Sequence, residues 1–233
     1  MKILSLDTSA TVASVAITDN STPLAEYTLN AKNTHSETLL PMIESALKAL
    51  SLKPCDIELF ALSAGPGSFT GVRIGAATVK GLAFASNKPC IEVSTLEALA
   101  QNLVIKEGLI CPVMNARRSQ VYTALFRSNG KELVRLMPDS ALSTEELDAI
   151  LTEYNEPIYL VGDGYELCEK EFTKTKPAYV PEAMRLQSAL SVAAIALKKY
   201  ESGEICTDSA LSVNYLRPSQ AERERAEREA NKI

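Results

Sequence analysis

The sequence predicts an α/β fold built from two halves that share one order of elements. Three observations support this prediction. The first thirty residues alternate between apolar and polar side chains as a three-stranded meander does, a glycine-bearing loop joins a strand to a helix in each half, and the order of elements begins again near residue 109. The 233 residues are 46% hydrophobic and 23% charged, which is typical of a globular chain.

In the first half we expect three strands, a helix, a strand, a helix, a strand and a helix. Asp7-Thr8-Ser9 and Asp19-Asn20-Ser21 separate the first three strands. Apolar residues recur at helical spacing up to residue 50, Thr34 and Glu37 suggest a capping box, and Pro41 suggests a kink or a later start. The expected strands cover 3–6, 12–17, 24–29, 57–63 and 90–93, and the expected helices cover 34–50, 69–86 and 96–104.

The second half repeats this order. Ser143 and Glu146 predict a capping box for its first helix, and the turn Gly162-Asp163-Gly164 leads into the next. The expected strands cover 109–114, 121–127, 133–137 and 158–161, and the expected helices cover 144–154, 165–172 and 187–200. We therefore expect one lobe over residues 1–106, a second over 107–217 and a charged tail over 218–233, read as a solvated terminal helix.

Charge and composition exclude several classes of protein. A net charge of −5 disfavours a broad basic surface for nucleic acid. Five widely spaced cysteines without a C-x-x-C motif indicate reduced thiols, and the single histidine, His35, has no second ligand at metal-binding spacing. The start of the chain has no signal-peptide pattern and no apolar stretch is long enough for a membrane span, so we expect a cytoplasmic protein.

Two loops are candidates for phosphate binding. The loop SAGPGSFTG lies where a strand ends and a helix begins, a place that attracts anions, but it matches neither a Walker loop nor a dinucleotide fingerprint. The turn after the first strand offers a carboxylate and hydroxyls for a hydrated cation and a phosphate. Close packing by glycines is the alternative explanation of the first loop. For the turn after the first strand, ordinary turn chemistry is the favoured explanation, because Asp, Thr and Ser are the residues expected there. The candidate residues are Asp7, Thr8, Ser9, Gly65, Gly67, Ser68, Thr70 and Gly71.

The two longest helices of the first half are apolar over a wide arc. Such helices bury one face inside their own domain, and some also bind a partner chain through a second apolar face. The sequence leaves both interpretations open, burial in the core alone and burial combined with a partner interface. The residues that we expect at a partner interface are Leu39, Leu40, Ile43, Leu47, Val72, Gly75, Ala76 and Val79.

Four segments resemble the TsaB family, also called YeaZ. They are LDTS, THSETLLPMIE, SAGPGSFTGVRIGAATVKGLA and VMNARRSQVYTALF, they occur in the family's order, and they span about half the chain. The resemblance implies a duplicated actin-like ATPase (ASKHA, RNase H-like) fold with two βββαβα-type lobes. It also implies a role in making threonylcarbamoyladenosine at position 37 of tRNAs that read codons beginning with A.

The resemblance further implies that the chain retains the fold but lacks the residues needed for catalysis. The paralogue TsaD binds a metal through two histidines, and Thr95 and Leu99 stand at their places here. The turn at Asn115, Arg117 and Arg118, which is equivalent to Asp7-Thr8-Ser9, has no Asp and no Gly. If a nucleotide lay between the halves, this side would lack a carboxylate and the room that glycine gives.

The expected role is a non-catalytic subunit without a metal or cofactor of its own. It would pair with TsaD, or with a second copy of itself when TsaD is missing, and the ATPase TsaE would dock on the pair. ATP and metal would be bound by the partner proteins, and a nucleotide could lie at the complex interface. The chain would contact tRNA only as part of the complex, and it would not bind a membrane. The alternative is an independent ATPase using Asp7 and the Gly65–Gly71 loop, or a peptidase.

Overall fold

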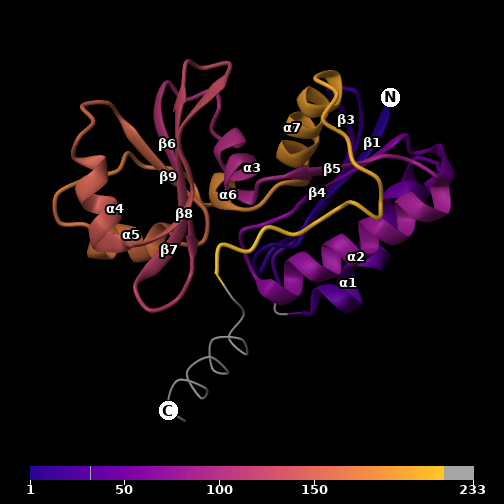
Figure 1. Cartoon of the computed structure of the whole chain (residues 1–233), viewed down its shortest axis with the longest axis horizontal. Coiled ribbons are helices and arrows are strands. Elements are labelled where there is room, and N and C mark those ends of the chain that lie inside the picture. Colours follow the sequence, from indigo (N-terminus) through magenta and orange to yellow (C-terminus); the bar gives the residue numbers. More distant parts are fainter. Residues whose placement is uncertain (32, 218–233) are drawn as a thin grey trace, which may run out of the picture.

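The computed structural model describes residues 1–31 and 33–217, which form two lobes side by side (Figure 1). Each lobe is built on one mixed sheet. The first sheet has the order β3-β2-β1-β4-β5 and the second has the order β8-β7-β6-β9, so the first four positions correspond. The strands of the first sheet are β1 (Lys2–Asp7), β2 (Ala13–Asp19), β3 (Thr22–Leu29), β4 (Leu59–Ser63) and β5 (Cys90–Val93). Those of the second are β6 (Gly108–Asn115), β7 (Gln120–Ser128), β8 (Leu133–Ser143) and β9 (Ile158–Val161).

Helices cover these sheets. They are α1 (His35–Ala49), α2 (Phe69–Ser86), α3 (Thr95–Gln101), α4 (Thr144–Leu151), α5 (Tyr165–Glu171), α6 (Glu182–Arg185) and α7 (Ala189–Glu201), with a short 3₁₀ turn at Pro54–Asp56. The order of elements and the repeated sheet confirm the predicted duplicated α/β fold. In the part of the chain that the structure describes, every helix falls short of the length or the apolarity that crossing a bilayer requires.

The first sheet is buried on both faces, which explains the near-continuous apolar runs of its central strands. Successive side chains of a strand point to opposite faces. Leu4 and Leu6 accordingly pack beneath α1 and α2, whereas Ile3 packs with Leu59 and Val192 beneath α7. Figure 1 shows α1 and α2 on one side of this sheet and α7 on the other.

Two helices, α3 and α7, pack across the division that we expected at residue 106. Leu96, Leu99 and Leu103, in and just after α3, are buried in the core of the second lobe. Val192 and Ile195 of α7 are buried against the first sheet instead. Helical periodicity shows that a helix buries one face, but it does not show which sheet receives that face.

The C-terminal segment after α7 also returns to the first lobe, although it was expected in the second. Cys206 exchanges backbone hydrogen bonds of 2.8 and 2.9 Å with Cys90 at the edge of β5. Further on, the Asn214 N–H donates to the Ala64 oxygen at 2.8 Å. The segment therefore covers an edge of the sheet that would otherwise be open. The expected charged tail, 218–233, lies outside the described residues.

Of the two predicted capping boxes, one is confirmed. At Ser143 the hydroxyl accepts from the Glu146 N–H at 3.2 Å, and the Glu146 carboxylate accepts from the Ser143 N–H at 2.8 Å. At Thr34 the prediction is wrong, because its hydroxyl pairs with the Ser36 hydroxyl at 3.1 Å instead of a helix N–H. Short polar side chains near a helix start often make such local bonds. Pro41 lies inside α1, which continues to Ala49.

Candidate functional site

The two candidate phosphate loops lie at the same edge of the first sheet and contact each other directly. They follow β1 and β4, which are parallel neighbours, so their carboxyl ends meet there. The Ser68 N–H donates to the Ser9 oxygen at 2.6 Å, and the Thr8 hydroxyl donates to the Gly71 oxygen at 2.8 Å. An amide that would otherwise face a bound phosphate is thus engaged by the neighbouring loop.

Glycines make this close contact possible. A Cβ atom would lie 2.4 Å from the Ser9 oxygen at Gly67, 2.1 Å from the Thr8 oxygen at Gly71 and 2.5 Å from the Thr8 hydroxyl at Gly75. Gly71 and Gly75, four residues apart in α2, and Gly67 just before this helix therefore all lie against the turn after β1. Their role in this structure is internal packing, one of the two readings that the sequence left open.

Asp7 is fully buried beneath the same contact. Its carboxylate accepts from the Ser63 hydroxyl at 2.5 Å, from the Ser9 hydroxyl at 2.6 Å and from the Ser9 N–H at 2.8 Å. Burial raises the pKa of Asp7 above its ordinary 3.8, although the hydrogen bonds from Ser63 and Ser9 oppose that rise. Both carboxylate oxygens already have protein partners, so coordinating a cation would require these bonds to break.

Replacing Asp7 by Asn is expected to preserve the fold and to remove a pH dependence. Because the folded chain raises the pKa of Asp7, it binds this proton more tightly than the unfolded chain does, and this contribution to stability is lost as pH rises through the folded pKa. Asp7→Asn should therefore match the wild type near pH 4 and gain relative stability towards neutral pH. Urea unfolding across that range checks this, and an Asn variant that loses relative stability with rising pH would contradict it.

A cleft of about 740 Å³ separates the candidate loops from the second lobe. Its second-lobe wall includes Asn115, Arg117 and Asp163. We expected no carboxylate on this side, and that expectation is wrong, because Asp163 reaches it from the loop after β9 and accepts from the Asn115 N–H at 3.0 Å. Burial raises the pKa of Asp163, with the Asn115 bond opposing. The turn Gly162-Asp163-Gly164, at the position equivalent to Gly65–Gly71, is the sequence feature that could have indicated this carboxylate.

The C-terminal segment forms a further wall of the cleft that the sequence did not reveal. The Tyr215 ring lies 4.8 Å from the Phe69 ring, and the Arg73 guanidinium lies 3.7 Å over Phe69 while donating to the Tyr215 hydroxyl at 2.7 Å. A Cβ at Gly65 would lie 2.3 Å from the Asn214 oxygen. This cluster holds the segment against the start of α2.

Seven of the eight side chains or glycines expected at a partner interface are buried inside the first lobe. They are Leu39, Ile43, Leu47, Val72, Gly75, Ala76 and Val79. Leu40, the exception, is 58% exposed. The residue assignment is therefore wrong for the seven, because the apolar stripe of an amphipathic helix faces its own sheet first.

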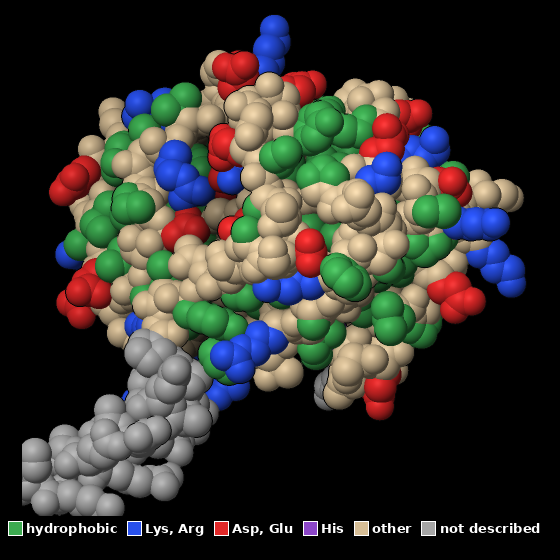
Figure 2. All heavy atoms as spheres, turned by 45° about the vertical axis from the view of Figure 1, so that its right-hand side comes forward, with side chains coloured by type: hydrophobic (Ala, Val, Ile, Leu, Met, Phe, Trp, Pro, Cys, Tyr) green, Lys and Arg blue, Asp and Glu red, His purple; other side chains and the backbone are tan. Residues whose placement is uncertain are grey.

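A different face of α2 is open. Ala77, Gly81 and Ala85 are exposed at spacings of four, and Phe84 beside them is 76% exposed. A Cβ at Gly81 would meet open space. Figure 2, with the side that carries α2 turned forward, shows hydrophobic side chains at the surface of this region. We call Ala77, Gly81, Phe84 and Ala85 the outer face of α2; its small residues allow another helix to approach closely.

The positions that correspond to the histidines of TsaD do not fit a metal ion. Thr95 and Leu99 are both buried, and Leu99 belongs to the apolar core of the second lobe. His35 Nε2 lies 2.7 Å from the Ala10 oxygen. Within residues 1–31 and 33–217, no three His, Cys, Asp or Glu side chains are grouped so that they could hold a metal.

Comparisons with known proteins show which family the chain resembles. Residues 24–224 match the family model described as TsaD: tRNA N6-adenosine threonylcarbamoyltransferase. The chain is 32% identical, over 95% of its length and 96% of the relative's, to the tRNA threonylcarbamoyladenosine biosynthesis protein TsaB of Bacillus subtilis. It also superimposes on YeaZ from Pseudomonas aeruginosa with a TM-score of 0.81 at 25% identity, covering 92% of this chain and 99% of that one.

A more distant likeness shows the fold alone. The ethanolamine utilization protein EutJ from Carboxydothermus hydrogenoformans matches 83% of this chain and 89% of its own with a TM-score of 0.53 at 13% identity. The fold is the duplicated actin-like ATPase fold that the resemblance implied. The four motifs, the two corresponding lobes and the full-length similarity lead to one conclusion: the chain belongs to the TsaB (YeaZ) family, within the wider family that the TsaD model describes.

Proposed function

We propose that this chain is a non-catalytic subunit in the biosynthesis of threonylcarbamoyladenosine at position 37 of tRNA. Its curated relatives carry this process in their names. The observation that carries the non-catalytic part of the proposal is the direct contact between the two candidate loops, in which Ser68 donates to Ser9 and Asp7 is enclosed by Ser9 and Ser63. Atoms that would bind phosphate or a cation are used to hold the fold.

The partner in this proposal is a TsaD transferase, bound through the outer face of α2 together with Leu40 of α1. Exposed small and aromatic side chains on one helix face favour a helix–helix contact. The ATPase TsaE docks on that pair, and a second copy of this chain takes the same surface when TsaD is missing. The partner proteins bind ATP and the metal, and a nucleotide can lie at the complex interface. The complex as a whole binds tRNA, in the cytoplasm.

An independent ATPase is the second candidate, because the cleft between the lobes is large enough for a small ligand. A peptidase lacks a comparable observation. Calorimetry with ATP and magnesium on the isolated chain discriminates between the subunit and the ATPase. Sub-millimolar binding that Asp7→Asn abolishes would favour the ATPase, whereas the subunit proposal predicts no such binding.

The proposal predicts that threonylcarbamoyladenosine synthesis, reconstituted from purified components of the source organism, stops when this chain is left out. Adding back the wild type or Asp7→Asn is expected to restore product equally, because Asp7 serves the fold. The nucleoside is quantified by mass spectrometry of digested tRNA. Full product without the chain would overturn the proposal, and restoration by the wild type but not by folded Asp7→Asn would overturn its non-catalytic part.

A further inference from the structure

Two cysteines lie opposite each other where the C-terminal segment returns to the first lobe. Cys90 begins β5 at the edge of the first sheet, and Cys206 lies 116 residues later, after α7. Figure 1 shows this segment in yellow, running from the end of α7 to the side that faces the second lobe. Both cysteines are free thiols in this structure.

The backbone places the two residues directly opposite each other. The Cys90 N–H donates to the Cys206 oxygen at 2.8 Å, and the Cys206 N–H donates to the Cys90 oxygen at 2.9 Å. This exchange defines a hydrogen-bonded pair of an antiparallel ladder, in which the Cα atoms are about 5.5 Å apart. That separation lies within the range that disulfides span. Opposite residues also extend their side chains from the same face of the sheet.

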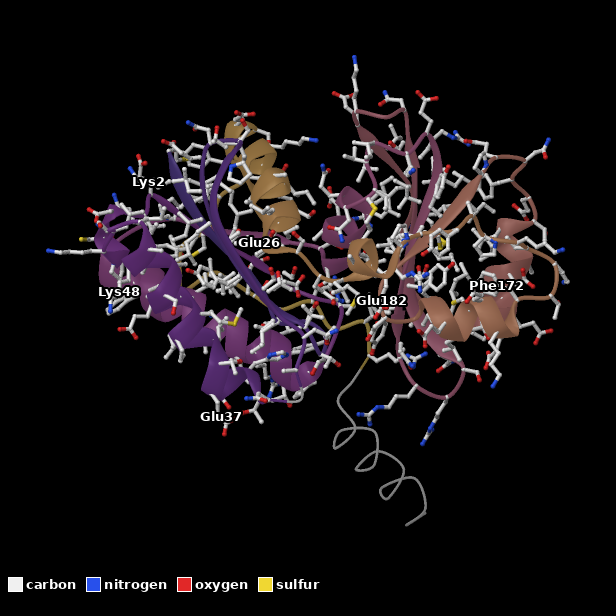
Figure 3. All side chains as sticks on the ribbon, turned by 180° about the vertical axis from the view of Figure 1, so that it is seen from behind. Lys2, Glu26, Glu37, Lys48, Phe172 and Glu182 are labelled. Atoms are coloured by element: carbon white, nitrogen blue, oxygen red, sulfur yellow. The ribbon has the colours of Figure 1, made fainter. Side chains whose placement is uncertain are left out.

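Both thiols lie on the sheet face that α1 and α2 cover. Cys90 is fully buried in the apolar cluster of that face, and Cys206, half-buried, packs against the same cluster. The Cys206 thiol donates to the Cys90 oxygen at 3.3 Å, so its sulfur points towards Cys90. Figure 3 shows this lobe from behind, with Glu37 and Lys48 marking α1 on one side of the sheet and α7 on the other.

The two thiols differ in their access to solvent. Burial raises the pKa of Cys90 to about 12, and the neighbouring Cys206 thiol adds to this rise. Burial and the Glu92 carboxylate raise the pKa of Cys206 as well, whereas Lys199 and Lys80 lower it. Reactivity of a thiol needs both the thiolate and access. Cys206 is therefore the thiol that an oxidant from solution meets first, and Cys90 lies where it reacts with the oxidised sulfur.

We propose that Cys90 and Cys206 form a reversible disulfide that fixes the C-terminal strap, residues 206–217, to the edge of the first sheet. The oxidant is a hydroperoxide such as hydrogen peroxide. The Cys206 thiolate attacks it, so that an S–O bond forms and the O–O bond breaks, and the hydroxide that leaves takes up a proton to become water. The Cys90 thiol then attacks the Cys206 sulfur. The S–S bond forms, the S–O bond breaks, and the hydroxide leaves with the Cys90 proton as a second water.

The geometry favours a bond that is readily reduced again. In a hydrogen-bonded pair the Cβ atoms lie about 5.5 Å apart, whereas a disulfide holds them at about 3.8 Å. The strap joins β5 through an isolated bridge and not through a regular strand, so it can move towards β5. The bond nevertheless retains strain, and strained disulfides are the more reducible ones.

The bond fixes one end of a strap whose other end lines the cleft. Beyond it, the Ser212 N–H donates to the Glu92 carboxylate and the Asn214 N–H donates to the Ala64 oxygen at 2.8 Å. Tyr215 then forms part of the cleft wall. The proposal therefore predicts that oxidation stabilises the strap against local opening. It is independent of the proposed function.

The test treats the full chain with hydrogen peroxide, unfolds it, blocks the remaining thiols with N-ethylmaleimide and maps the peptides by mass spectrometry without reduction. We expect one cross-linked pair of peptides, joined through Cys90 and Cys206. Millimolar reduced glutathione, added before blocking, should remove the cross-link and restore the label on both thiols. Full labelling of Cys90 after oxidation, or a cross-link that resists glutathione, would overturn the proposal.

Cys206→Ser is the decisive variant, because the residue is partly exposed and serine keeps a donor of similar size. It should abolish the cross-link and leave Cys90 fully labelled. Cys55→Ser is the matched control, since it removes an exposed thiol elsewhere and should leave the cross-link unchanged. Cys111 and Cys168, buried in the second lobe, should stay labelled throughout. A cross-link from Cys206 to Cys55 in place of Cys90 would contradict the proposal.

Hydrogen exchange measures the effect on the strap. In the oxidised wild type the Ser212 and Asn214 amides should exchange about tenfold more slowly than in the reduced protein, because the bond restricts local opening. Peroxide should have no such effect on Cys206→Ser. Should that variant fold poorly, the peptide maps of the wild type and Cys55→Ser still decide whether the bond forms. Equal exchange in the oxidised and reduced wild type would overturn the role assigned to the bond.

Discussion

Gly71→Ala is expected to lower the free energy of unfolding by about 2 kcal/mol or more. The new methyl group would lie 2.1 Å from the Thr8 oxygen, so either α2 or the turn after β1 must shift. That shift also strains the bond from the Thr8 hydroxyl to the Gly71 oxygen. Alanine's better helix propensity recovers only ~1 kcal/mol of this loss. Urea unfolding monitored by circular dichroism measures the difference.

Gly81→Ala is the matched control, since it is the same substitution in the same helix. A Cβ there would have no neighbouring atom within 4 Å, so the higher helix propensity of alanine determines the change in stability. The free energy of unfolding should rise by ~0.5–1 kcal/mol. Opposite signs for the two substitutions are the expected result. A Gly71→Ala variant as stable as the wild type would contradict the close contact between α2 and the turn after β1.

Ala77→Glu and Phe84→Glu are expected to weaken binding to TsaD about tenfold or more. Both residues are exposed on the outer face of α2, so neither change disturbs the core. At a helix–helix contact, however, each would bury a carboxylate without a partner, which is costly. Surface plasmon resonance with purified TsaD measures the affinity.

Ala149→Glu serves as the control, because it places the same charge on an exposed alanine of α4 in the second lobe. It should bind TsaD as the wild type does. Unchanged affinity in both α2 variants, with correct folding, would show that the partner occupies another surface. Gly75, by contrast, is unsuitable for this test, because a Cβ there would lie 2.5 Å from the Thr8 hydroxyl and would disturb folding itself.

Much of the candidate site was predictable because its signals are local. The Asp7-Thr8-Ser9 turn and the Gly65–Gly71 loop each follow a strand, and parallel pairing then brings them to one edge. Asp163 was missed as a cleft residue because its loop pairs with the backbone of Asn115, distant in sequence.

The sequence by itself determined the elements, their repeated order and the family. Strand alternation, helical spacing and the four motifs are properties of neighbouring residues, so no knowledge of distant contacts was needed. Only the tertiary structure decided which surface each apolar face meets. Leu39 and Val79 face the first sheet, α3 and α7 change lobes, and the outer face of α2 stays open. Burial is a property of the packed chain, because the hydrophobic effect favours the removal of any apolar face from water. It does not specify which surface that face packs against.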